Sequence, residues 1–393
     1  MADIYKRMHL YLDSSKLEHK LVANELDIPE TTFSNWYTKG QHISIYSLLK
    51  ISSKLSPLER NIQEMDAIQH LKKHSRQNIN VKIAFLIAHL NGFDKLLEYI
   101  IDFCGNHSAL EMKRCFKIFH LYKCRLDGSR ELEEIFLDIE SSRPSNNKKH
   151  FQIGMFCDIL SMLILCDLGK FDLMRPYKQR IEKNLKLIKN KELIKLYNFW
   201  IDSIWGYALL RSNDIIGFQQ VYRSLMKFDD LKFFPVMQAV IDSRIGESNL
   251  FSNENEEVAF YYLEKACNTL ASLGEEHKYK IALNTLNFLR IIKWKDIDKI
   301  DLNTLDMAEK SLYFININQK IQANELLDYL EMKNKGLSPI QRVYRGMANN
   351  DLDEISKAID AMKVKNDFFY AGFAQRIFNE YKKRSIQSIG KGF

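Results

Sequence analysis

A group of polar and charged residues near the N-terminus carries the donors and acceptors that proteins use to contact DNA. Asn35 has both a donor and an acceptor and can bond the edge of an adenine. Ser34 and Thr31 can bond bases or phosphates, and Lys20 and Lys39 are placed to contact phosphates. The candidate DNA-contacting residues are Lys20, Glu30, Thr31, Ser34, Asn35 and Lys39.

These side chains need a helix that turns them outward, and the apolar residues around them predict a helix-turn-helix. The apolar positions of two short helices fall on one shared face: Val22, Ala23, Leu26, Ile28, Phe33 and Trp36. Ala23 is small, as the contact between the two helices requires. Asp27 stands at the turn position that glycine usually occupies, and Asp tolerates the left-handed backbone there better than most residues.

Local signals predict where the helices of this bundle begin and end. Ser15 and Glu18 predict a capping box for the first helix of the pair, and Pro29 opens the second. Lys39 and Gly40 end the second helix. A further amphipathic helix over 43–55, stopped by Ser56 and Pro57, closes the bundle.

Charge permits contact with nucleic acid but does not demand it. The net charge is +7, from 57 basic and 50 acidic residues, and the N-terminal bundle is nearly balanced. Basic residues recur over 178–191, a spacing more typical of a solvated helix face than of a second DNA site. The alternative for the N-terminal segment is a compact bundle whose polar face is merely solvated.

Composition and recurring breaks predict an all-α chain of stacked helical pairs. Only 15 Gly and 6 Pro occur in 393 residues, and 46% of the residues are hydrophobic. Polar breaks recur roughly every 32 to 44 residues, at 91–94, 127–129, 168–172, 212–214, 247–249, 316–318 and 349–351. The long gap between two of them holds an unmarked repeat near Leu273 and Gly274. This layout is typical of degenerate tetratricopeptide repeats, and the alternative is a plain all-helical domain.

The expected organisation is a DNA-binding domain over 1–57, a connecting helix or linker over 58–76, and a repeat superhelix over 77–393. The six cysteines show no metal-ligand spacing and fit reduced, buried thiols in a cytoplasmic protein. No signal peptide or membrane-spanning stretch is expected. His70 and His74 lie four residues apart, but a third ligand is lacking, so no metal site is expected. The motifs of common enzyme classes are absent, so we expect neither catalysis nor a cofactor.

A DNA-binding bundle followed by a long degenerate tetratricopeptide array resembles the peptide-sensing regulators of Gram-positive bacteria. Within that group the chain is most similar to the arbitrium receptors of temperate Bacillus phages. The residues that suggest this are mainly C-terminal: Leu286 to Leu289 ahead of Trp294, then 317–320 leading into 326–331, then 344–346 and Asn349 with Asn350. The resemblance covers most of the chain.

The resemblance implies a homodimeric transcriptional regulator in the bacterial host cell that binds a palindromic operator and controls the choice between lysis and lysogeny. It also implies a short signalling peptide in the groove of the repeats. Asn284 and Asn287 are candidate clamps for that peptide, with Asp202, Arg244 and Arg290 as candidate partners for its charged ends. The helices over 355–362 and 368–381 are candidates for self-association.

Two alternatives remain open at this level. The central segment around Trp200 carries bulky aromatic residues where such receptors place asparagines, so the chain can be a relative that does not sense a peptide. From another functional class, the chain can be a protein-interaction module whose N-terminal bundle binds and sequesters a partner protein.

Overall fold

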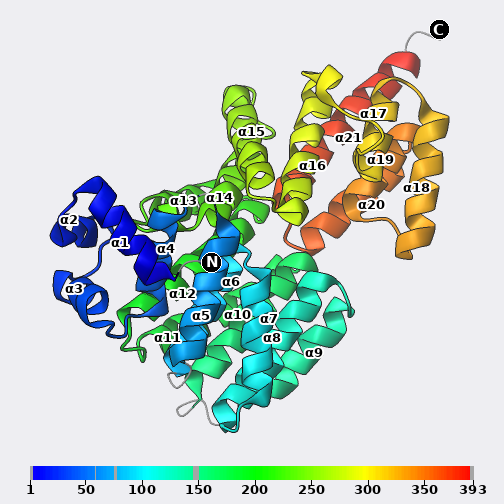
Figure 1. Cartoon of the computed structure of the whole chain (residues 1–393). Coiled ribbons are helices and arrows are strands. Elements are labelled where there is room, and N and C mark those ends of the chain that lie inside the picture. Colours follow the sequence, from blue (N-terminus) through cyan, green and yellow to red (C-terminus); the bar gives the residue numbers. More distant parts are fainter. Residues whose placement is uncertain (1–2, 58, 75–77, 145–149, 390–393) are drawn as a thin grey trace. The chain divides into compact units, whose positions relative to one another are not determined.

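The computed structural model describes residues 3–57, 59–74, 78–144 and 150–389. Within these residues the chain forms the helices α1 to α21 and three short 3-10 helices, η1 to η3, and no strand (Figure 1). The predicted all-α fold is confirmed. Residues 1, 58, 76, 77 and 393, at which the predicted domains begin or end, lie outside the described residues.

The chain forms two compact units. Unit 1 comprises Met1–Ile164, Tyr177–Ile201 and Lys227–Met237, and unit 2 comprises Leu165–Pro176, Asp202–Met226 and Gln238–Phe393. Helices α10, α11, α12 and α14 contribute residues to both units. None of the helices in the described part of the chain has the length and apolar character that crossing a bilayer requires.

The first four helices of unit 1 form the predicted N-terminal bundle. They are α1 (Ile4–Ser15), α2 (His19–Glu25), α3 (Glu30–Lys39) and α4 (Ile45–Leu55). The six apolar residues predicted to share a core across the helix-turn-helix are all buried. Tyr5 of α1 stacks on Trp36 of α3 with ring centroids 4.8 Å apart. Burial of one face of each short helix therefore holds the bundle together.

The ends of these helices follow the sequence signals with one exception. Gly40 has a φ of 63° and ends α3, and Ser56 ends α4. The predicted capping box of Ser15 and Glu18 is wrong, because α1 continues through Ser15 and the next residue ends it in a left-handed conformation. The Ser15 hydroxyl instead donates to the carbonyl of Leu12 at 3.5 Å, and Glu18 precedes α2 without a side-chain cap.

The rest of unit 1 packs around an aromatic core. Its helices are α5 (Arg60–His74), α6 (Asn78–Asn91), α7 (Asp94–Asn106), α8 (Leu110–Asp127), α9 (Leu132–Ser142), most of α10 (Phe151–Asp167), most of α11 (Arg175–Leu185), the first half of α12 (Lys191–Arg211), and η2 (Leu231–Phe233). Phe85 stacks on Phe119 with centroids 3.8 Å apart, and Phe156 meets Phe85 edge-on at 5.3 Å. Trp200 of α12 is 2% exposed and lies 6.1 Å from Phe85, so this aromatic residue of the central segment belongs to the core.

Unit 2 is built from successive helical pairs. Beyond η1 (Phe171–Met174) and the second half of α12, its elements are α13 (Ile215–Met226), most of α14 (Pro235–Ser248), α15 (Glu256–Ser272), α16 (Glu276–Lys293), η3 (Ile297–Lys299), α17 (Met307–Asn316), α18 (Lys320–Asn334), α19 (Pro339–Asn349), α20 (Leu352–Val364) and α21 (Phe368–Ile389). Helices α15 and α16, α17 and α18, and α19 and α20 pack extensively as neighbours, and α20 also packs extensively against α21. The breaks at 273–274, 316–318 and 349–351 lie between the two helices of the first three pairs. This is the pairing that the recurring breaks predicted.

The predicted breaks end helices through a left-handed backbone conformation. Seven of them contain a residue with φ between 55° and 69°: Gly92, Gly128, Gly169, Asn213, Gly274, Asn318 and Asn350. Gly and Asn adopt this left-handed region at the least steric cost, and it ends a helix within one residue. The same chemistry is used in both units.

Candidate nucleic-acid interface

The turn between α2 and α3 has the backbone conformation that the sequence predicted. Asp27 has a φ of 50°, and its N–H bonds the carbonyl of Asn24 at 3.1 Å. The N–H of Ile28 bonds the carbonyl of Ala23 at 3.0 Å, which turns the Ile28 side chain into the core. Ala23 is fully buried. Figure 1 shows α2 and α3 as short helices at one edge of unit 1.

Helix α3 has one anchored face and one accessible face. Phe33 and Trp36 are 0% and 1% exposed, so they fix the inner face. The predicted contact residues lie on the other side: Glu30, Thr31 and Lys39 are exposed, and Ser34 and Asn35 are half-buried. Lys20 is exposed on α2. The side chain of Asn35 is therefore not enclosed in the bundle, as contact with a base edge requires.

The first turn of α3 is open for further contacts. Its N-terminal cap is Pro29, which provides no side-chain acceptor, so the first backbone N–H groups of α3 have no side-chain partner at the cap. Such groups, at the positive end of the helix dipole, favour anions such as phosphate. Glu30 in the same turn repels phosphate but can accept from the amino group of cytosine.

The sequence analysis missed Thr38, which lies on the same face of α3 as Thr31 and Ser34. It is exposed and lies four residues after Ser34 and seven after Thr31, which is the spacing of one helix face. Its hydroxyl donates to the carbonyl of Ser34 at 2.7 Å. The helical spacing alone could have identified it.

Aromatic contacts hold α3 against α1 and α2. The Tyr37 hydroxyl and Nδ1 of His9 are 2.7 Å apart, and the ring of His19 meets Tyr37 edge-on at 4.3 Å. Burial, and to a smaller extent Asp13, raises the pKa of Tyr37, so the phenol is neutral at physiological pH. The candidate contact residues of α3 therefore lie on a helix whose position is fixed.

Two of the predicted peptide-clamping residues pair with each other. Asn287 is 5% exposed, and its side-chain oxygen accepts from Nη1 of Arg290 at 3.1 Å. Nη2 of Arg290 lies 3.6 Å from Glu264 on the adjacent helix α15. Asn284 is half-buried on the same helix α16. Asn287 and Arg290 thus contribute to the contact between α15 and α16.

Arg244 lies in a different polar cluster of unit 2. Its guanidinium lies 3.7 Å from the centroid of the Tyr207 ring and forms an ion pair with Glu247. The Tyr370 hydroxyl donates to the same Glu247 at 3.3 Å. Asp202 is half-buried on α12. The sequence analysis predicted Arg244 and Asp202 but missed Tyr207 and Tyr370, because these two rings reach Arg244 and Glu247 from helices α12 and α21, which are far from α14 in the chain.

The C-terminal helices use their apolar faces inside unit 2. Ile355, Ala358, Ile359 and Met362 of α20 are buried. On α21, Phe369, Tyr370 and Phe373 lie around the ring of Phe251, with centroid distances of 4.9, 5.7 and 4.7 Å. Phe369 is buried and Tyr370 and Phe373 are half-buried, so these rings pack around Phe251 within unit 2. Self-association through α20 and α21 stays a prediction.

The structure adds a third ring to the two histidines considered as metal ligands. His42, from the segment between α3 and α4, contacts His70 and His74 with centroid distances of 5.3 and 4.6 Å. Across the described residues, no group of three or more His, Cys, Asp or Glu side chains is arranged to hold a metal ion. Five of the six cysteines are buried and Cys166 is half-buried, and none forms a disulfide.

Comparison with known proteins identifies the relatives of this chain. The family described as AimR transcriptional regulator-like matches residues 61–376. An uncharacterized protein of Bacillus anthracis is 25% identical over 269 residues, which cover 67% of this chain and 97% of that protein. The solved structure of phAimR-Ligand has a TM-score of 0.69 at 15% identity and covers 86% of this chain and 98% of its own. SeMet-phAimR has a TM-score of 0.64 at 14% identity, covering 95% and 99%.

Proposed function

This chain belongs to the AimR transcriptional regulator-like family, and from that premise we propose that it regulates transcription by binding an operator in double-stranded DNA through α3. Glu30, Thr31, Ser34 and Asn35 contact bases in this proposal, and Lys20 and Lys39 contact phosphates. The regulated process that the family resemblance suggests is the choice between lysis and lysogeny of a bacteriophage.

The observation that carries this proposal is the division of α3 into two faces. The buried pair Phe33 and Trp36 fixes the helix, while Thr31, Ser34 and Asn35 lie accessible on its other side. A recognition helix needs both properties, because its polar side chains must reach base edges from a rigid support. A bundle that merely solvates a polar face has no need of a helix held in this way against both α1 and α2.

We further propose that the active form is a homodimer. One helix-turn-helix makes too few contacts for operator affinity, and a dimer engages two half-sites at a fixed separation. The apolar inner faces of α20 and α21 are used within unit 2. Among the exposed apolar residues of unit 2 are Ile321 and Met332 of α18 and Val364 of α20, which are 74%, 77% and 81% exposed. These side chains supply the apolar surface for self-association.

Control by a short peptide bound to the repeat helices is the finer part of the proposal. Arg244 supports it best, because its side chain is 22% exposed and its aromatic neighbour Tyr207 can pack against a peptide. Asn287 and Arg290 would have to exchange their mutual hydrogen bond for contacts with the peptide. Asn284 and Asp202, both half-buried, complete the proposed peptide-contacting set.

A protein-interaction module is the second candidate function, and the balanced charge of the N-terminal bundle favours it. Glu30 at the start of α3 opposes phosphate, and a bundle without a strong positive field can bind a protein partner instead. The two candidates differ in their dependence on salt. A DNA-binding protein releases counterions and loses affinity steeply as the salt concentration rises.

The test is DNA binding by the wild-type chain, Asn35→Ala and Ser34→Ala, measured by fluorescence anisotropy at two salt concentrations. The DNA samples are candidate operators from the region around the gene and a random duplex of equal length. Each lost base contact should weaken operator binding by about 1–3 kcal/mol, which is roughly 5-fold to more than 100-fold, and leave random DNA nearly unaffected. Asn106→Ala, at an exposed asparagine of α7, is the matched control.

Equal operator affinity for Asn35→Ala, Ser34→Ala and the control would remove α3 as the DNA-contacting helix. Absence of any salt-dependent DNA binding by the wild type would favour the protein-interaction module instead.

A further inference from the structure

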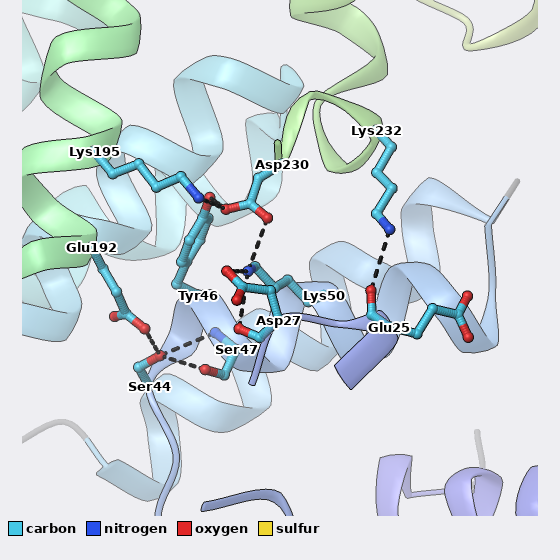
Figure 2. A network of polar contacts seen from close by, with 10 residues as sticks. All are labelled: Glu25, Asp27, Ser44, Tyr46, Ser47, Lys50, Glu192, Lys195, Asp230 and Lys232. Atoms are coloured by element: carbon cyan, nitrogen blue, oxygen red, sulfur yellow. Dashed lines mark hydrogen bonds and ion pairs between the residues drawn. The ribbon is translucent and has the colours of Figure 1, made fainter. Parts of the chain in front are cut away.

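A buried ion pair joins the bundle to a distant segment of unit 1. Lys50 of α4 is 3% exposed and Asp230, next to η2, is 1% exposed, and Nζ of Lys50 lies 2.9 Å from Oδ1 of Asp230 (Figure 2). These residues are 180 positions apart in the chain. Two charges removed from water in this way depend on each other, because either one left alone in the interior is strongly unfavourable.

Lys50 also contacts the turn that precedes α3. Its Nζ lies 3.5 Å from both the backbone carbonyl and Oδ2 of Asp27, the residue in the left-handed conformation. Asp27 is the residue from which the chain passes into the recognition helix. The Lys50 ammonium therefore bridges the Asp230 carboxylate and the turn at Asp27.

The second oxygen of Asp230 holds two more elements. The Tyr46 hydroxyl of α4 donates to Oδ2 of Asp230 at 2.7 Å, and Nζ of Lys195 on α12 donates to the same oxygen at 2.5 Å. Burial alone would raise the pKa of Asp230, but hydrogen bonds from Lys195, Lys50 and Tyr46 outweigh it and lower that pKa. Asp230 is therefore a carboxylate with three donors around it.

Two contacts flank this centre and tie the same elements together. The Ser44 hydroxyl at the start of α4 donates to Glu192 of α12 at 2.6 Å. Nζ of Lys232 donates to the carbonyl of Glu25, at the end of α2, at 3.3 Å. As Figure 2 shows, α2, α4, α12 and the segment with η2 meet around Asp230.

The chain continues directly from these anchoring segments into unit 2. Helix α12 carries Lys195 in unit 1 and passes into unit 2 after Ile201. The segment with Asp230 passes into unit 2 after Met237, within α14. A ligand that displaces α12 or the start of α14 therefore acts on covalent neighbours of the anchor.

We propose that Asp230 is the positioning residue for the recognition helix: through Lys50 it fixes the turn at Asp27. The proposal rests on the proposed DNA-binding function for its consequence, while its structural part can be tested without DNA. Lys50, Tyr46 and Lys195 all bond the Asp230 carboxylate, and together with it they form the anchor.

Hydrogen exchange of the full chain, followed by mass spectrometry, tests the structural part. Asp230→Asn removes the charge at nearly constant shape, and we expect amides over 26–50 to exchange at least tenfold faster. Asp158→Asn is the matched control, because Asp158 is also 1% exposed, lies in unit 1 and bonds two cations, Arg143 and Arg180. It should lower the melting temperature while the exchange of 26–50 stays within twofold of the wild type.

A second variant covers the case in which Asp230→Asn does not fold. The Lys195 side chain is 31% exposed and can reach water, so Lys195→Gln should fold and accelerate exchange over 26–50 severalfold. Exchange over 26–50 that is unchanged in the folded variant, or changed no more than in Asp158→Asn, would overturn the proposal.

Operator binding supplies the functional readout. We expect Asp230→Asn to weaken operator binding at least tenfold, and Asp158→Asn to leave it within twofold. If the amides over 26–50 exchange faster in Asp230→Asn while its operator affinity equals that of the wild type, the positioning role is refuted. If the wild type binds no DNA, the proposed function fails, and the exchange data still decide whether Asp230 anchors the turn.

Discussion

His70 should make the stability of unit 1 depend on pH in a defined direction. The ring is 8% exposed and its Nε2 has no hydrogen-bond partner. Burial, followed by the neighbouring rings of His74 and His42 and by Lys73, lowers the pKa of His70 to about 3. The folded chain therefore holds His70 neutral at pH values where an exposed histidine, with a pKa of about 6.5, takes up a proton.

The magnitude follows from linkage between protonation and folding. Below pH 6.5 the unfolded state binds one more proton than the folded state, so stability is fully present above the unfolded pKa and falls as the pH decreases toward 3. The slope approaches about 1.4 kcal/mol per pH unit. With a folded pKa of about 3 and an unfolded value of about 6.5, the loss at pH 4.5 is about 2.7 kcal/mol.

The assay is native-state hydrogen exchange of α5 at pH 6.5 and pH 4.5, with each rate corrected for intrinsic exchange. It reports the opening free energy of the helix that carries His70 and does not require the whole chain to unfold in one step. His70→Gln removes the titrating group. About 0.4 kcal/mol of the loss has already occurred at pH 6.5, so between pH 6.5 and pH 4.5 the opening free energy of the variant should fall by about 2.3 kcal/mol less than that of the wild type. Carboxylates that also titrate are common to both proteins and cancel in the difference.

His277→Gln is the matched control, because His277 is exposed on α16 of unit 2. It should show the same pH dependence in α5 as the wild type. If the wild type and His70→Gln lose equal opening free energy between the two pH values, the buried neutral state of His70 is refuted.

Two further predictions concern unit 2. Gly346→Ala should destabilise the chain by about 1–3 kcal/mol in thermal unfolding, since its Cβ would lie 2.5 Å from Cγ1 of Ile355 and 2.8 Å from the backbone oxygen of Asp351. Gly372→Ala, with no atom within 4 Å of the new Cβ, should be neutral or stabilising, and equal losses would contradict the argument. Short peptides encoded beside this gene should raise the melting temperature, corresponding to about 2.7 kcal/mol at a hundredfold excess over Kd. Arg244→Gln should abolish most of that shift, and an undiminished shift would exclude Arg244 from the peptide site.

The parts of the fold that depend on neighbouring residues could be predicted from the sequence. Val22, Phe33 and Trp36 gave the bundle its core because helical spacing decides which residues share a face. Asp27 and the glycines at the breaks were predictable because a left-handed residue is a local requirement. The capping box at Ser15 was wrong although its residues fit the motif, because Ser15 is the last residue of α1 and α2 begins only at His19.

Contacts between distant segments could not be predicted in the same way. Asn287 and Arg290 have the chemistry of peptide clamps, yet they lie three residues apart on one helix and satisfy each other. The partner of Arg244, Glu247, is also local, whereas the ring of Tyr207 reaches it from another helix. A polar side chain in a helix thus has both local and distant partners available, and only the fold decides between them.

Lys50 shows why such distant pairs matter for function. Lysine side chains are almost never fully buried unless they are paired, and Lys50 is enclosed together with Asp230. An apolar pair of similar size would often stabilise this junction as well or better, so stability alone does not explain two buried charges. The donors and acceptors of a buried ion pair keep their hydrogen bonds in only one arrangement of the two side chains, whereas an apolar contact tolerates several. In the proposed function α3 places Asn35 against a particular base edge, which needs such an arrangement because an error of about 1 Å would break a bidentate contact. The buried charge pair is therefore better explained by accurate placement of α3 than by the free energy of unfolding.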